Sequence, residues 1–168
     1  MYGAGASGHG PSVQFAQKYG MSLTDYSRSG AFMTSRRVSR NTLLIIHQVE
    51  RAIQEGAKAD LIILQGGCND IYAGMTLGEL ETDGIVGFDS ATYAGAVEYC
   101  VTKLRAAYPN AVIMLLRPHN IGVLSQKRQQ EVGEVFRQTC EKWGLICADV
   151  YGDMASVAIG GPAELSDH

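Results

Sequence analysis

An Asn-Asp pair, Asn69-Asp70, follows two glycines and a cysteine shortly after an apolar run. The run, residues 61–64, reads Leu-Ile-Ile-Leu without polar alternation, which predicts a strand buried on both faces of a parallel sheet. Ligands of open α/β sheets bind just beyond the carboxyl ends of the strands, so we expect Asn69 and Asp70 to lie where chemistry would be done. Glycine lets a backbone and a ligand approach closely, but Gly-Gly-x-Asn-Asp is also ordinary turn chemistry. This segment alone leaves both interpretations open.

A second glycine block favours the functional interpretation. Gly30 ends a strand-like stretch that begins at residue 22, and the Gly67-x-Asn69-Asp70 block follows later in the chain. This order resembles the SGNH (GDSL-type) esterase and acylhydrolase family, which is named for a serine, a glycine, an asparagine and a histidine in four blocks. The resemblance implies that the backbone N–H of Gly30 and the side-chain amide of Asn69 are two oxyanion-hole donors. The third donor in the family is the backbone N–H of the nucleophilic serine.

The first and last blocks of that family are only partly present. Gly3 fits the last glycine of the first block, which would place the serine two residues before Met1. Asp167 fits the aspartate of the last block, which would place the histidine two residues beyond His168. By the resemblance, Asp167 orients that histidine, and the histidine activates the serine. We therefore expect residues 1–168 to form one SGNH-like domain cut at both ends. The parent protein is expected to cleave an O-acyl ester of a carbohydrate or a small ester, and the chain as given is expected to be inactive.

Other candidate groups belong to the same expected pocket. His119 follows another predicted strand and is expected to line the pocket, with catalysis by this residue as a minor alternative. Cys68 is the variable residue of the Gly67 block and would be reactive only if it were exposed with a lowered pKa. Asp70, like His119 and Cys68, is expected to contact the substrate, although fixing the loop by accepting hydrogen bonds from backbone N–H groups is its more natural role. Ser7, in a Gly-rich loop with no strand before it, and the terminal His168 are weak internal substitutes for the missing groups.

The composition argues against several other classes of protein. The chain is 46% apolar and 18% charged, which is typical of a globular domain. Its net charge of −3 comes without a basic block, so no nucleic acid or anionic membrane surface is expected as a partner. No apolar stretch approaches the roughly 20 residues needed to span a bilayer. No C-x-x-C pair or zinc-type spacing occurs, so neither a metal nor a cofactor is expected, and Cys100, Cys140 and Cys147 are expected to be buried thiols. Compartment and oligomeric state stay open.

Predicted helices and strands alternate along the chain. This order predicts an α/β fold of three layers (α/β/α) with a parallel, flavodoxin-like sheet in the order 2-1-3-4-5, in which the first, central strand is missing. Residues 72–88 are glycine-rich and without period, and are expected to form a substrate lid or a surface excursion. Arg117, near a strand end, is expected to form a surface salt bridge or to meet a polar substrate. The predicted strands are residues 22–27, 60–65, 111–116 and 145–150, and the predicted helices are residues 11–19, 41–55, 125–143 and a segment running from a cap at Asp89 or Ser90 to Pro109.

Two other functions compete with ester hydrolysis. A non-catalytic binding or structural module of the same fold is favoured if the sequence is taken literally, because no serine stands in the right context. A flavodoxin-like nucleotide or flavin binder is a weaker alternative, because no glycine-rich phosphate loop follows a strand. Activity on a short-chain ester distinguishes hydrolysis from both.

Overall fold

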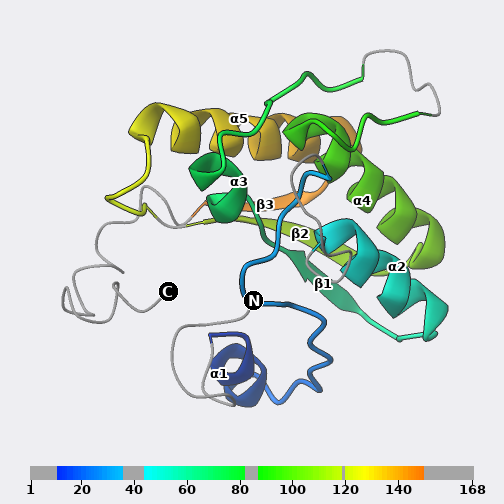
Figure 1. The fold of residues 1–168 in the computed structure, drawn as a ribbon. Coiled ribbons are helices and arrows are strands. Elements are labelled where there is room, and N and C mark those ends of the chain that lie inside the picture. The colour runs from blue at the N-terminus through cyan, green and yellow to red at the C-terminus, as the bar shows by residue number, and fades with distance from the viewer. Residues whose placement is uncertain (1–10, 36–43, 82–86, 119, 150–168) are drawn as a thin grey trace.

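A computed structural model of the chain describes residues 11–35, 44–81, 87–118 and 120–149 (Figure 1). The predicted alternation of helices and strands is confirmed over most of this range. The short helix α3 is not in the sequence prediction, which has a turn at that point. In chain order the elements are α1 (Pro11–Lys18), α2 (Ile45–Gln54), β1 (Leu61–Leu64), α3 (Cys68–Tyr72), α4 (Tyr93–Ala107), β2 (Val112–Arg117), α5 (Gln126–Trp143) and β3 (Ile146–Asp149).

The three strands form one parallel sheet in the order β1-β2-β3. Leu64 of β1 pairs with Leu115, and β2 continues to Arg117, which pairs with Asp149 at the end of β3. Helices α2, α4 and α5 pack beside one another on one face of this sheet, and α1 lies on the other side (Figure 1). The α/β class and the parallel sheet are therefore as predicted. All strand ends that carry candidate residues meet at the same edge of the sheet, because parallel strands point the same way.

The strand predicted at residues 22–27 is not formed. Its backbone is irregular and mostly exposed. Asp25 accepts hydrogen bonds from the backbone N–H and the hydroxyl of Ser27, at 2.8 and 2.6 Å, and such local side-chain bonds compete with strand pairing. A cavity of about 620 Å³ separates this segment from β1 and is lined by both. The sheet therefore has a gap beside β1 within the described residues.

Sequence-readable caps define the ends of the two longest helices. The Ser125 hydroxyl accepts from the backbone N–H of Arg128 at the start of α5, and Gly144 ends that helix in a left-handed conformation with φ 61°. These ends agree with the helix predicted over residues 125–143. Helix α4 begins later than predicted, because Thr92 rather than Asp89 or Ser90 caps it, by accepting from the N–H of Gly95. The bounds of both helices therefore come from local chemistry.

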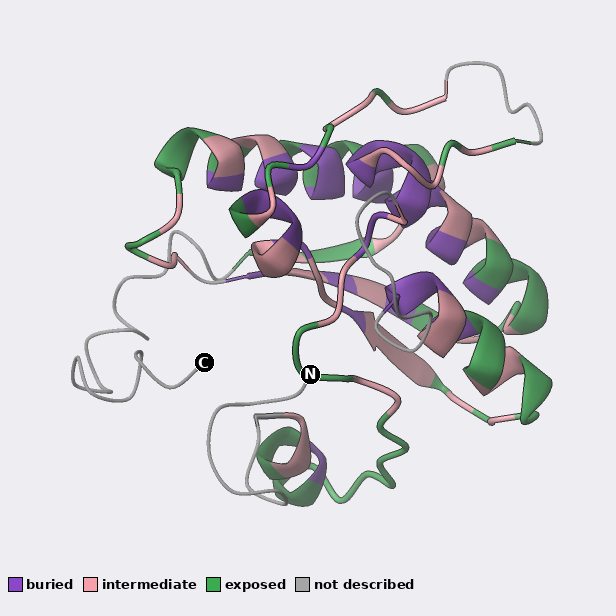
Figure 2. Cartoon of the chain, viewed as in Figure 1, coloured by how far each residue is buried: buried purple, intermediate pink, exposed green. Residues whose placement is uncertain are grey.

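The core lies between α4, α5 and the sheet (Figure 2). The apolar residues on the inner faces of α4 and α5 are buried, and fully burying such a side chain contributes about 1.5–3 kcal/mol. Figure 2 shows the contrast with the segment that follows α1, which is largely exposed. These buried residues include Tyr93, Val97, Cys100, Val101 and Leu104 on α4 and Val132, Val135, Phe136 and Cys140 on α5.

Cys147 departs from the expected burial of the cysteines. Cys100 and Cys140 are buried, and burial raises the pKa of each thiol to about 12. Cys147 is exposed because β3 is the outer strand of the described sheet, and three of its four residues face solvent. Strand periodicity alone does not tell a central strand from an outer one.

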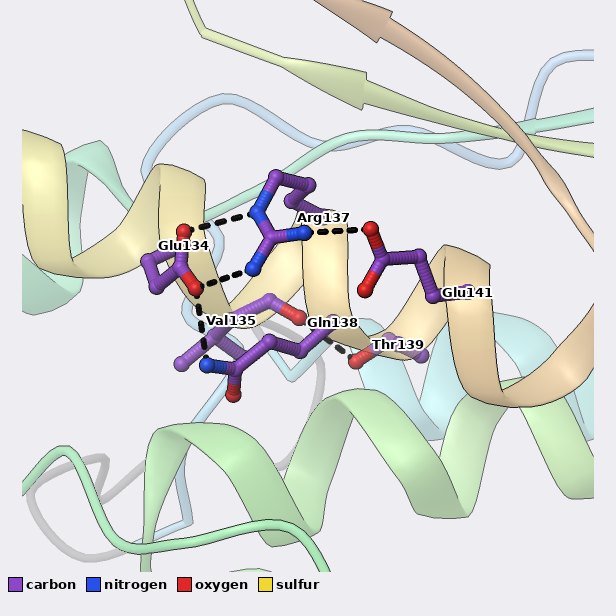
Figure 3. Close-up of polar contacts among 6 residues, drawn as sticks. All are labelled: Glu134, Val135, Arg137, Gln138, Thr139 and Glu141. Carbon is purple, nitrogen blue, oxygen red and sulfur yellow. Dashed lines mark hydrogen bonds and ion pairs between the residues drawn. The ribbon is translucent and has the colours of Figure 1, made fainter.

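The outer surface of α5 carries charged pairs at helical spacing (Figure 3). Arg137 bonds Glu134 and Glu141, one turn before and one turn after it, and Gln138 also donates to Glu134 at 2.8 Å. The Arg137 guanidinium lowers the pKa of Glu134 to about 2. These exposed pairs lie on the polar face of α5, which is the face turned to solvent. In the described part of the chain, no helix has the length and apolar character to cross a bilayer.

Candidate active site

The turn between β1 and α3 is packed tightly from two sides. A Cβ on Gly66 would lie 2.4 Å from the Ile45 Cδ1, and a Cβ on Gly67 would lie 2.7 Å from the Tyr93 hydroxyl. Gly67 also has φ 123°, a conformation that other residues rarely adopt. The glycines are needed for close approach, as the sequence predicts, but the approaching groups are protein side chains.

Asn69 contacts the segment that follows Gly30. Its side-chain nitrogen donates a 2.9 Å hydrogen bond to the carbonyl of Ala31. Gly30 itself is exposed with φ 74°, in a turn closed by a 3.3 Å bond from the Ala31 N–H to the Arg28 carbonyl. The structure therefore brings the two predicted glycine blocks together, although they are far apart in the sequence. The bond to Ala31 uses one of the two hydrogens of the Asn69 amide and fixes its orientation.

Asp70 connects α3 to the same segment. Its carboxylate is fully buried and accepts from the Met33 N–H at 2.9 Å, and from the N–H and hydroxyl of Thr34, both at 2.8 Å. Burial raises the pKa of Asp70 above its usual value, against these hydrogen bonds, which lower it. Both oxygens are engaged by protein donors, which agrees with the loop-fixing interpretation and argues against the expected contact with substrate.

Cys68 is partly buried at the start of α3. Burial, with a smaller effect from the Asp70 carboxylate, raises the pKa of its thiol to about 11. The thiol is therefore protonated at neutral pH, which removes the reactivity that the sequence left open. His47 is half-buried on α2, which is typical of an ordinary residue of an amphipathic helix. Four candidates, Ser7, His119, Asp167 and His168, lie outside the described residues.

The carboxyl ends of β2 and β3 carry a second polar cluster. Arg117 is only 13% exposed at its side chain, and its guanidinium bonds Asp149 Oδ2 at 2.8 Å and the Gln129 carbonyl at 3.3 Å. The salt-bridge prediction for Arg117 is confirmed, but the pair is more sheltered than a surface bridge. A Cβ on Gly133 would lie 2.2 Å from Arg117 Nε, so this glycine makes room for the guanidinium.

The loop after β2 is held by one buried glutamine. The Gln129 side chain accepts from the Ile121 N–H at 2.9 Å and donates to the carbonyls of Ile121 and Leu124 at 3.1 and 3.2 Å. Sequence reasoning did not single out Gln129 or Tyr93 as residues of the site, although the Tyr93 hydroxyl bonds the Gly66 carbonyl. Gln129 sits among polar residues and Tyr93 on an apolar helical face, so neither carries a signal that singles it out.

The expected substrate lid runs away from Asn69 in its described part. The N–H of Tyr93 bonds the Thr76 carbonyl at 2.9 Å, and the N–H of Glu81 bonds the buried Glu98 carboxylate at 2.8 Å. Lys142, in the last turn of α5, also bonds Glu98 and the Glu81 carbonyl. That turn leads into the amino end of β3, so Glu81 lies toward the edge of the sheet opposite Asn69. Over residues 73–81 the structure therefore favours the surface excursion. Residues 82–86 lie outside the described residues.

Among the described residues, no group of His, Cys, Asp and Glu side chains is arranged to hold a metal ion. The polar groups at the carboxyl edge of the sheet are a carboxamide, backbone N–H groups and a sheltered ion pair. Of these, the carboxamide and the backbone N–H groups are hydrogen-bond donors, the kind of group that stabilises a developing negative charge on oxygen.

The comparisons with known proteins bear on the family and the fold of the chain. The model of the GDSL-like lipase/acylhydrolase family matches residues 1–168, and the chain belongs to that family. No curated protein matches the sequence. The resemblance noted from Gly30 and the Gly67 block is thus confirmed at the level of the family.

Solved structures with this fold include three proteins of low sequence identity. A protein from Lactobacillus plantarum is 23% identical, with a TM-score of 0.68 over 88% of this chain and 74% of that one. A protein from Bacteroides ovatus with the provisional name of GDSL-like lipase is 23% identical, with a TM-score of 0.60 over 82% of this chain and 63% of its own. A carbohydrate acetylesterase from Sinorhizobium meliloti is 12% identical, with a TM-score of 0.63 over 82% of this chain and 68% of its own. At these identities the likeness shows the fold.

Proposed function

We propose that this chain forms the site of an ester hydrolase that removes an O-acyl group, such as acetyl, from a carbohydrate or a small ester. The observation that carries the proposal is the 2.9 Å bond from Asn69 to the Ala31 carbonyl, which joins the Asn block to the segment directly after Gly30. Membership of the acylhydrolase family supports the reaction class. The carbohydrate acetylesterase among the proteins of the same fold supports the substrate class.

Acyl transfer passes through a tetrahedral intermediate with a negatively charged oxygen. In our proposal the second hydrogen of the Asn69 amide and the backbone N–H of Gly30 donate to that oxygen. Donors that are already oriented cost no reorganisation when the charge develops. Asp70 contributes indirectly, because its three bonds hold α3, and therefore Asn69, against residues 33 and 34.

The remaining groups of the mechanism are a serine nucleophile, a histidine base and a carboxylate that orients the histidine. We propose Asp167 for the carboxylate, from its match to the last block of the family. His119, two residues after the end of β2 in the sequence, is proposed as a residue of the pocket wall. Cys68 and Asp70 are left without a direct contact to substrate, because one is a protonated thiol and the other is fully bonded to protein.

The test is hydrolysis of p-nitrophenyl acetate and of an acetylated sugar. Both the chain as printed and a form extended with the flanking sequence of its own source DNA are assayed. Asn69→Ala is expected to lower kcat about 10²–10³-fold, the usual cost of removing one oxyanion donor. Asn110→Ala is the matched control, because Asn110 is exposed in the turn before β2, at the opposite edge of the sheet.

Activity that is lost in Asn69→Ala and kept in Asn110→Ala supports the proposal. Equal activity in wild type and Asn69→Ala contradicts the assignment of Asn69. No hydrolysis by either form of the wild-type protein rejects the enzymatic function and favours a non-catalytic binding module.

A further inference from the structure

Tyr93 is a buried tyrosine whose hydroxyl reaches the turn in front of α3. It is the first residue of α4 and is completely buried. Its hydroxyl donates a 2.8 Å hydrogen bond to the Gly66 carbonyl, at the end of β1. Its ring stacks on Phe136 with centroids 6.1 Å apart, which limits the directions in which the hydroxyl can point.

The same residue also holds the chain behind α3. The backbone N–H of Tyr93 donates to the Thr76 carbonyl at 2.9 Å. Tyr93 therefore bonds the chain both before and after α3, the helix that carries Asn69. The 2.8 Å bond from the hydroxyl holds the Gly66 carbonyl, and this carbonyl belongs to the Gly66–Gly67 peptide, so the bond fixes the direction of that peptide.

The direction of that peptide determines how α3 begins. Gly67 precedes the helix with φ 123°, and its carbonyl accepts the first helical bond from the Ile71 N–H at 2.9 Å. A rotation of the Gly66–Gly67 peptide would turn the first residues of α3 and swing the Asn69 side chain with them. The contact between Gly67 and the Tyr93 hydroxyl leaves little free space for such a rotation.

We propose that Tyr93 is a positioning residue of the esterase site: its hydroxyl orients the Gly66–Gly67 peptide and so directs the Asn69 amide toward the oxyanion. The expected effect on kcat rests on the proposed function. The expected effect on the orientation of the Asn69 amide rests on the structure alone. Tyr93 does not touch the substrate in this scheme. Burial raises the pKa of Tyr93 well above its usual value, so the phenol is a hydrogen-bond donor over the whole pH range of an esterase assay.

The experiment compares wild type with Tyr93→Phe in the form that hydrolyses p-nitrophenyl acetate. We expect kcat to fall about tenfold or more and KM to change less than twofold, since small misplacements of catalytic groups cost one to two orders of magnitude. The shape of the pH profile is expected to stay the same, because Tyr93 exchanges no proton. In protein labelled with ¹⁵N-asparagine, the side-chain amide signals of Asn69, assigned by their loss in Asn69→Ala, are expected to shift.

Two controls separate positioning from general stability. Tyr99→Phe removes a hydroxyl from the same helix that bonds the exposed Glu50 at 2.6 Å, and is expected to leave kcat and the Asn69 signals unchanged. Val101→Ala removes buried volume from the same helix and is expected to lower the melting temperature without changing kcat below that temperature. If Tyr93→Phe does not fold, 3-fluorotyrosine at position 93 keeps the hydroxyl and alters its donor strength, and the Asn69 signals are compared with those of 3-fluorotyrosine at position 99.

The outcomes distinguish the two proposals. A fall in kcat together with shifted Asn69 signals supports the inference. Unchanged Asn69 signals, or a kcat that only follows the melting temperature as in Val101→Ala, overturn it. If the wild-type protein has no esterase activity, the proposed function fails, and the Asn69 signals alone then decide whether Tyr93 sets the orientation of Asn69.

Discussion

Asp70→Asn is expected to weaken the connection between α3 and residues 33 and 34. The carboxylate accepts three bonds through two oxygens, from the Met33 N–H and from the N–H and hydroxyl of Thr34. An amide of the same shape keeps one oxygen and presents an NH₂ group in place of the other. Whichever way the amide is oriented, a backbone N–H of Met33 or Thr34 then faces another donor.

The size of the effect follows from these bonds. Losing one hydrogen bond to a charged group costs about 1.5–3 kcal/mol, and leaving a buried N–H without an acceptor costs about 1–3 kcal/mol. An amide is easier to bury than the carboxylate, whose pKa burial raises, and this offsets part of the loss. We expect a net decrease in the free energy of unfolding of about 2–4 kcal/mol, and a fall in melting temperature on the order of 10 °C.

Urea unfolding followed by circular dichroism measures this loss directly. Asp25→Asn is the control, because Asp25 makes similar bonds to Ser27 in an exposed loop and its replacement is expected to change stability by less than about 0.5 kcal/mol. An unchanged urea midpoint in Asp70→Asn would refute the reasoning, because the bonds of Asp70 would then not be what holds α3 in place. In that case, the proposal that Asp70 holds Asn69 in position through α3 would also lose its support.

Three further changes test other parts of the structure. Gly133→Ala is expected to lower the free energy of unfolding by about 1–3 kcal/mol in urea unfolding, because the new methyl group would collide with the sheltered Arg117 guanidinium. Gly67→Ala is expected to destabilise by about 3 kcal/mol in the same assay, since it combines a φ of 123° with a Cβ in contact with a buried side chain. Arg137→Met is expected to raise the pKa of Glu134, followed by NMR titration, from about 2 toward 4.5. Because the folded-state pKa of Glu134 is lowered, its small stabilising effect is present above about pH 4.5, is lost as the pH falls toward 2, and is weakened by salt.

Each of these changes has a matched control. Gly56→Ala is the control for Gly67→Ala, because Gly56 also has a positive φ, 67°, but lies in open space. Gly122→Ala is the control for Gly133→Ala, because Gly122 has neither a positive φ nor a neighbour within 4 Å. Arg51→Met removes the partner of Glu55 and is expected to leave the pKa of Glu134 where it is. The first prediction is contradicted if Gly133→Ala is no less stable than Gly122→Ala. The second is contradicted if Gly67→Ala and Gly56→Ala lose equal amounts of the free energy of unfolding. The third is contradicted if Arg137→Met leaves the pKa of Glu134 unchanged.

Local sequence chemistry determined much of the architecture of this protein. Several of its features depend only on residues a few positions apart, so they can be recognised without the fold. They are the all-apolar run at β1, the helical spacing of the inward residues of α4 and α5, and the residues Ser125 and Gly144 at the ends of α5. The Gly67-x-Asn69-Asp70 block likewise marked the edge of the sheet at which we propose the site, and the family resemblance that it carried is confirmed.

The tertiary structure decided everything that depends on partners distant in the sequence. Residues 22–27 have a strand-like pattern but lack a paired neighbour, and Cys147 lies on an outer strand, so pairing and burial overrode the local pattern in both cases. The bond from Asn69 to Ala31, the three bonds of Asp70 and the hydroxyl of Tyr93 beneath Gly66 all join segments far apart in the chain. A hydrogen bond depends on distance and angle between two groups, and neither exists for such pairs until the chain has folded.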